Sequence, residues 1–195
     1  MKRMEDNNER HLSRPLVIVA AALFSAGIVA GWITYLHRSA IRAQHLSGTA
    51  AWWQQSIVAA LALAALASSY WRGRRAGRPI WLLRPLGHRA GARAARLARD
   101  AGTCPAAFAR AALALPLALL FLYGFWRAGF QVTNGLDPNA TVNAWGGPTY
   151  AGAMACHYLD VVVIMAAAAW LLDRILPAAA VRPARARPDR PAVAR

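Results

Sequence analysis

Four long apolar segments constrain this chain more than any other feature of its sequence. They cover residues 15–36, 50–71, 106–129 and 149–172. A helix needs about 20 mainly apolar residues to cross a bilayer, and each segment is long enough. Aromatic residues stand near the segment ends, where amphipathic rings meet the membrane interface. The sequence therefore predicts an all-α membrane protein, a helical bundle with four transmembrane helices.

The charge between these segments predicts their direction. The 195 residues include 23 Lys and Arg against 8 Asp and Glu, a formal net charge of +15. The arginines gather before the first segment, between the second and third, and after the fourth, and few occupy the other two loops. Because basic loops stay in the cytoplasm, both termini are predicted to be cytoplasmic. A basic excess is also typical of nucleic-acid binding, but here it lies between apolar spans, which favours a membrane.

Three regions follow from this pattern. Residues 1–14 form a cytoplasmic leader, and residues 15–176 form the transmembrane domain with its basic cytoplasmic loop at 72–105. Residues 177–195 are rich in Pro, Ala and Arg, without apolar periodicity, and are expected to be disordered. The bias towards Ala and Arg is typical of GC-rich bacterial genomes, so we expect a multi-pass protein of the bacterial plasma membrane.

The basic loop contains a stretch with helical spacing of its arginines. Arginines at four positions fall near one helical face, with Ala and Leu opposite: Arg89, Arg93, Arg96 and Arg99. This pattern predicts a segment that lies on anionic lipid headgroups. Docking of an acidic partner or of nucleic acid is the alternative.

The fourth segment carries two ionisable residues, His157 and Asp160. At about 1.5 Å per residue, Asp160 lies near the middle of the bilayer. A charged side chain there costs at least about 2.5 kcal/mol, so we expect this face to point into the bundle. His157 and Asp160 are expected to interact with each other or with the first and third segments. Gly152 and Cys156 share their face and are small enough for close helix packing.

Other segments supply polar or small side chains at matching depths. The first contains a GxxxG pattern, Gly27 and Gly31, which is typical of a close-packing face. The remaining members of the candidate intramembrane polar site are predicted near the midplane or in an outer vestibule: Ser25, Gln54, Gln55, Tyr123 and Arg127.

The sequence contains no motif of a known enzyme class and no cluster of metal ligands, so no catalytic residue, metal or cofactor is expected. Three functions stay open. The first is a small transport or channel component that uses His157 and Asp160. The second is a non-catalytic scaffold or accessory subunit, and the third is a membrane enzyme that acts on lipid. The expected partners are the bilayer with its anionic headgroups, and a second copy or a partner membrane subunit.

Overall fold

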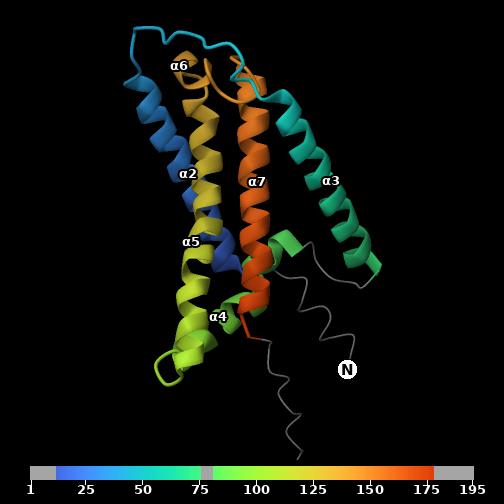
Figure 1. Ribbon diagram of the computed structural model, residues 1–195. Coiled ribbons are helices and arrows are strands. Elements are labelled where there is room, and N and C mark those ends of the chain that lie inside the picture. Colours follow the sequence, from blue (N-terminus) through green and yellow to red (C-terminus); the bar gives the residue numbers. More distant parts are fainter. Residues whose placement is uncertain (1–11, 76–80, 178–195) are drawn as a thin grey trace, which may run out of the picture.

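The computed structural model describes residues 12–75 and 81–177, and within them the chain is helical, with no strand. The predicted leader and tail therefore lie almost wholly outside the described residues. In chain order the elements are α2 (Arg14–Leu36), α3 (Trp52–Arg75), the 3-10 helix η1 (Trp81–Leu86), α4 (His88–Asp100), α5 (Pro105–Asn134), α6 (Pro138–Thr141) and α7 (Tyr150–Ile175) (Figure 1).

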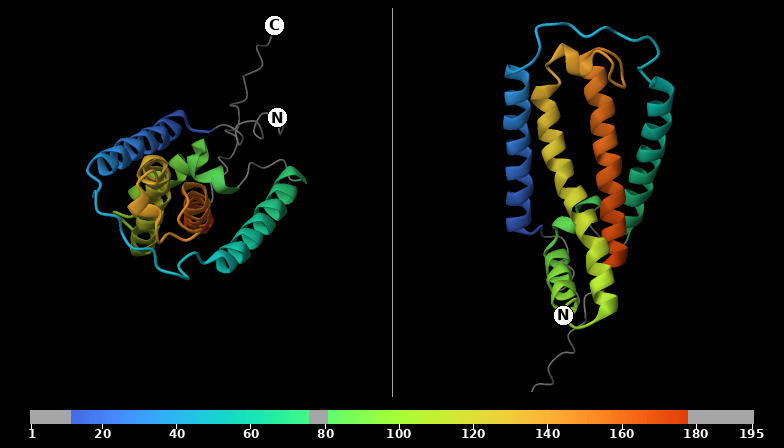
Figure 2. Two further views of the ribbon diagram at one scale, coloured as in Figure 1. Left: turned by 90° about the horizontal axis from the view of Figure 1, so that it is seen from above. Right: turned by 60° about the vertical axis from the view of Figure 1, so that its left-hand side comes forward.

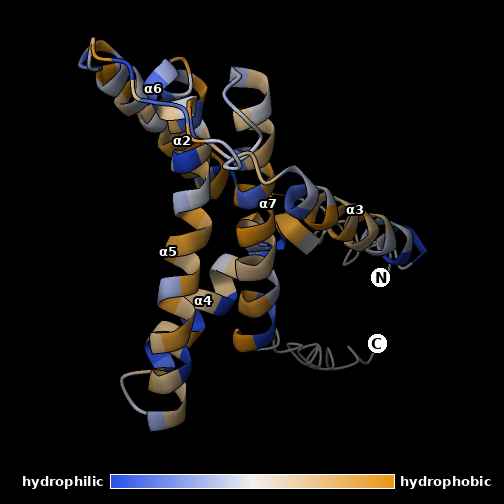
Figure 3. Cartoon of the chain, turned by 45° about the horizontal axis from the view of Figure 1, so that its top comes forward, coloured by the Kyte–Doolittle hydropathy of each residue, from blue (hydrophilic) through white to orange (hydrophobic). Residues whose placement is uncertain are grey.

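Three of the helices, α2, α5 and α7, are long and apolar enough to cross a membrane. Hydrophobic residues dominate these spans, and hydrophilic residues gather towards the ends of the molecule (Figure 3). The all-helical prediction is thus confirmed for the described residues, and the three apolar helices support a membrane-embedded chain. The predicted count of four spans is not. Helix α3 has 24 residues, but its glutamines and its closing arginines make it less apolar than the other three.

Helices α2 and α5 pack through glycine. A Cβ atom on Gly27 would lie 2.1 Å from the carbonyl oxygen of Trp126, and Gly31 makes a similar approach one turn later. From the other side, a Cβ atom on Gly129 would lie 1.9 Å from the carbonyl oxygen of Phe24. No other residue fits at such distances, so these glycines let the two backbones touch. Close van der Waals contact of this kind is what drives helix association in a membrane.

Helix α7 packs on α5 with methionine side chains set against glycines. The Met165 side chain occupies the space where Gly124 lacks a Cβ, and Met154 does the same at Gly135. The buried residues of α7 extend from Ala153 to Leu172, so the contact runs along most of the helix. Helices α2, α5 and α7 therefore form the packed part of the bundle.

Helix α3 stands apart from that bundle. It separates from α7 towards its end in Figure 1, and the view from above in Figure 2 shows it outside the group formed by α2, α5 and α7. Gln55, near its start, is its one buried residue. Its large apolar side chains stay exposed, including Trp53, Leu61, Leu63 and Trp71. The second apolar segment thus folds as a helix without entering the core.

The connecting segments gather at two opposite ends. At one end the amide of Ser13 donates to the carbonyl of Leu86, which joins the start of α2 to η1 beside the end of α7. At the other end Asn139 and Asn143 bind the backbone of the segment between α2 and α3. The start of α2, the η1–α4 segment and the end of α7 therefore share one end, called the basic end below.

Candidate functional site

The predicted pair, His157 and Asp160, lies on α7 with both side chains half-buried. Among the described residues, no hydrogen bond joins one to the other. The carboxyl of Asp160 is instead reached by Gln55, whose Nε2 donates to Oδ1 over 3.5 Å. The polar partner of Asp160 thus comes from the second apolar segment, whereas we expected His157 or the first and third segments.

Gln55 is short of hydrogen bonds. Gln55 is only 4% exposed, yet its Oε1 has no hydrogen-bond partner among the described residues. The bond to Asp160 is at the long limit for a hydrogen bond. An ionised carboxylate only accepts, so it offers Oε1 no donor. With the amide turned over, Oε1 faces Asp160, and only a protonated carboxyl donates to it. In either orientation the pair lacks a hydrogen-bond partner.

One further member of the predicted site, Arg127 of α5, lies near α7. His157 is close enough to Arg127 of α5 and to Asp160 for both charges to act on it. The Arg127 guanidinium also stands 5.6 Å from the ring centre of Phe130. Polar side chains from three helices, α3, α5 and α7, therefore gather in one region.

The other three predicted members do not join this region. Ser25 is exposed on α2, because the face that packs on α5 is the one that carries Gly27. Gln54 is exposed next to the buried Gln55, and Tyr123 is exposed and stacks on Trp126.

The small residues of α7 meet a loop rather than another span. A Cβ atom on Gly152 would lie 2.0 Å from the carbonyl oxygen of Gly146. Gly146 has φ +91, a left-handed conformation that suits glycine, and it lies near the Cys156 sulfur. The close approach predicted for Gly152 and Cys156 is thus made by the segment before α7.

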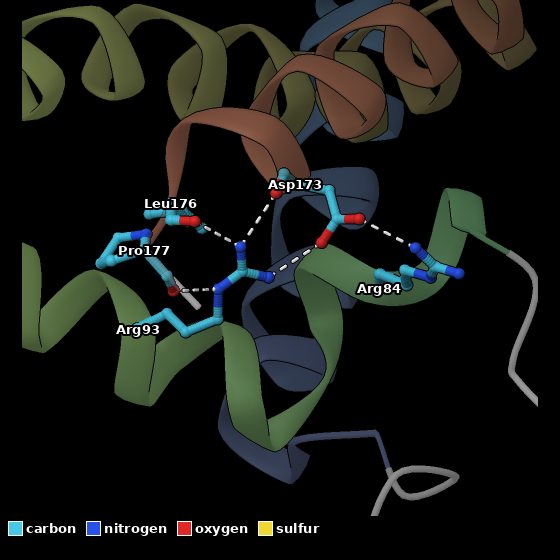
Figure 4. A network of polar contacts seen from close by, with 5 residues as sticks. All are labelled: Arg84, Arg93, Asp173, Leu176 and Pro177. Atoms are coloured by element: carbon cyan, nitrogen blue, oxygen red, sulfur yellow. Dashed lines mark hydrogen bonds and ion pairs between the residues drawn. The ribbon is translucent and has the colours of Figure 1, made fainter. Parts of the chain in front are cut away.

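A second polar cluster occupies the basic end and was not predicted (Figure 4). Asp173, near the end of α7, receives Arg84 Nη1 on Oδ2 and Arg93 Nη1 on Oδ1, each at 2.8 Å. Arg93 also donates to three backbone carbonyls at the end of α7: Nε to Pro177 at 2.7 Å, Nη2 to Asp173 at 2.9 Å, and Nη2 to Leu176.

Arg93 therefore acts as a C-cap for α7. The last carbonyls of a helix have no partner within it, and they carry its negative dipole end. A guanidinium supplies five donors in one plane and remains charged, so it serves several carbonyls and a carboxylate together. The cluster locks η1 and α4, which belong to the basic loop, onto the end of α7.

The arginine face predicted for lipid binding is consequently divided. The Arg93 side chain is only 16% exposed and turns towards α7, because Asp173 and the helix end compete for it. Arg96 is half-buried, and Arg89 and Arg99 are exposed. An acid near the end of α7, facing a basic loop, is the sequence signal that points to such a contact.

Within the described residues, no group of His, Cys, Asp or Glu is arranged to hold a metal ion. The chain matches no known family model, no curated protein and no solved structure.

Proposed function

We propose that this chain is an accessory, non-catalytic subunit of a membrane assembly, in the plasma membrane of a bacterium. Its α3–α7 face receives a helix of a partner membrane protein. The observation that carries the proposal is the Gln55–Asp160 pair, which lies between α3 and α7 and in which Gln55 Oε1 lacks a hydrogen-bond partner.

The energetics support a partner at this place. A buried amide oxygen without a donor costs about 1–3 kcal/mol. A carboxyl at membrane depth costs at least a similar amount unless it is paired. A partner helix that supplies a donor to Gln55 Oε1 and a second donor to the Asp160 carboxyl relieves both costs. Polar contacts between membrane helices are commonly used in this way.

Helix α3 is the element suited to accommodate such a partner. Its single buried residue is a glutamine, so packing on α7 stabilises its present position weakly. Leu61 and Leu63 are each 66% exposed and available to a second apolar helix. A partner seated between α3 and α7 covers part of this exposed apolar surface together with the polar pair.

The topology that we propose keeps both termini and α4 in the cytoplasm. Its support is the sequence, which concentrates arginine at the basic end. Cys104, which is exposed in the turn between α4 and α5, reports on that end once Cys156 is replaced by Ala. Ser47→Cys, with both native cysteines replaced, reports on the opposite end. An impermeant thiol reagent should label intact cells at position 47 only. Labelling of Cys104 in intact cells would show that the basic end lies outside the cell, opposite to the proposed orientation.

Site-specific photocrosslinking tests the assembly. A photoreactive amino acid replaces Ile164, which is exposed one turn from Asp160, or Ile18, which is exposed on α2 as the matched control. In native membranes, position 164 should crosslink to a second membrane protein, and position 18 should not. Asp160→Leu should weaken that crosslink. Crosslinks to lipid alone at position 164 would refute the proposal.

A transport component is the second candidate. It is favoured by the meeting of Asp160, His157 and Arg127, since ionisable groups inside a membrane often mark proton or ion pathways. Purified protein in proteoliposomes would then conduct protons, and Asp160→Asn would abolish the flux. That result would replace the accessory-subunit proposal, whereas no flux from either protein would leave it standing.

A further inference from the structure

An apolar groove lies at the basic end, between α4 and α5. Its volume is about 620 Å³, within the range of ligand sites. The start of α2 and the end of α7 complete its walls. The lining residues have apolar side chains or are glycine, and they include Ala94 and Leu97 of α4, Ala101 just after it, and Phe108, Leu115 and Phe121 of α5.

Helix α4 directs its apolar face into this groove. Ala94, Leu97 and Ala101 follow helical spacing, and the arginines of α4 occupy the remaining directions. Leu97 is buried, whereas Ala94 and the facing Phe108 and Leu115 stay exposed. The described chain thus leaves hydrocarbon surface uncovered where α4 and α5 diverge.

The groove is somewhat longer than one membrane leaflet is thick, and it runs from the basic end towards the apolar helices of the bundle. From Phe108 to Leu122 it follows α5 for about 20 Å, at about 1.5 Å per residue. One leaflet of the hydrocarbon core is about 15 Å thick. Leu16 of α2 and Leu172 of α7, both on membrane-crossing helices, line the groove as well, so it continues into the bilayer.

Two arginines adjoin residues of the groove's lining in sequence, Arg99 next to Ala98 and Arg110 next to Ala111. Arg99 lies near the end of α4, and Arg110 lies near the start of α5. Both are exposed. Arg99 bonds only to the carbonyl of Ala95 in its own helix, and within the described chain Arg110 makes no hydrogen bond or ion pair. Asp100 adds one acid, so this region keeps a net positive charge.

We infer that the groove binds one anionic phospholipid. An acyl chain covers the apolar walls, and the phosphate meets Arg99 and Arg110. Guanidinium groups bind phosphate through paired, charge-assisted hydrogen bonds. The lipid thereby completes the packing between α4 and α5 that the protein leaves open.

The test compares two tryptophan variants of the full chain. Ala94→Trp fills the groove, and Ala95→Trp adds the same bulk to α4 at an exposed position that does not line the groove. Each protein is delipidated in detergent and titrated with phosphatidylglycerol or phosphatidylcholine, and bound lipid is counted by native mass spectrometry. Parent and Ala95→Trp should bind one phosphatidylglycerol, and Ala94→Trp should bind it about tenfold more weakly or worse.

The arginines are tested separately. The double variant Arg99→Gln with Arg110→Gln should lose the preference for phosphatidylglycerol and bind both lipids alike. A phosphatidylglycerol that carries a photoreactive acyl chain should label residues 90–101 and 108–122 of the parent protein, which tests the site without any variant.

Three results would overturn the inference. The first is equal binding of the two lipids by the parent. The second is unchanged phosphatidylglycerol binding by Ala94→Trp, or photolabelling outside the two stretches. The third is a parent dimer that Ala94→Trp converts to monomer, since the groove would then be covered by a second copy of the chain.

Discussion

The guanidinium of Arg93 should stabilise this protein more than any other single charge at the basic end. Its side chain reaches Asp173 Oδ1 and the carbonyls of Pro177, Asp173 and Leu176. Arg84 makes a single contact to Asp173, and its side chain is 34% exposed. The perturbation is Arg93→Ala, compared with Arg84→Ala.

The expected magnitude follows from geometry. A hydrogen bond to a charged group contributes about 1.5–3 kcal/mol, and a cation at a helix C-terminus adds about 0.3–1 kcal/mol. Because the bonds share one side chain, they do not add, and we expect Arg93→Ala to cost about 2–4 kcal/mol. Arg84→Ala, which removes one half-exposed ion pair, should cost about 0.5–1 kcal/mol.

Thermal unfolding of lipid-free protein in detergent measures the difference. One kcal/mol corresponds to about 2–4 °C for a chain of this size, so Arg93→Ala should lower the Tm by about 5–15 °C. Arg99→Ala is the matched control, because Arg99 is exposed on the same helix. An Arg93→Ala protein that melts within a degree of the Arg99→Ala protein would refute the capping role, as would an equal loss in Arg84→Ala.

Two further predictions concern helix packing and the end opposite the basic one. Gly129→Ala should destabilise by about 1–3 kcal/mol because its Cβ would press on a backbone carbonyl of α2, whereas Gly91→Ala, with open space around it, should melt like the parent. Asn139→Ala removes the side chain that holds the segment between α2 and α3, so trypsin should cleave after Arg42 several times faster than in Gln44→Ala, whose side chain makes no such contact. Unchanged cleavage would show that other contacts hold the segment.

The helices were predictable because their signals are local. Apolar runs of sufficient length and the GxxxG spacing of Gly27 and Gly31 are readable within a single segment. The limit appears at α3, where an apolar run with two glutamines was predicted as an equal member of the bundle. Helix α3 stands apart because its small and large side chains offer no glycine face like that of α2. Helix packing depends on the surfaces of both helices, and the sequence of one segment does not show which helix it will contact.

The side-chain contacts were less predictable because they join distant parts of the chain. The bond from Gln55 to Asp160 spans 105 positions, and that from Arg93 to Asp173 spans 80. Helical spacing grouped Arg93 with three other arginines on one face of α4. Its side chain turns towards α7 because it binds Asp173 there. Spacing likewise assigned Gln55 to a vestibule, although the fold buries it.

The two acids of α7 have different roles. Asp173 stabilises the fold of the chain itself, whereas Asp160 is assigned to binding of a partner. Asp173 is bound by two arginines, whereas Asp160 has one long bond to an amide. Asp173→Asn should therefore cost about 1.5–3 kcal/mol in detergent, because it removes the charge that both arginines meet. Asp160→Asn supplies an amide donor to Gln55 Oε1, so its stability should equal or exceed that of the parent by up to about 1 kcal/mol. The same variant should still weaken capture of the partner helix if the carboxyl is what that helix binds. Equal losses of Tm in the two variants would mean that Asp160 also serves the isolated fold, and the assignment of the α3–α7 face to a partner would lose its basis.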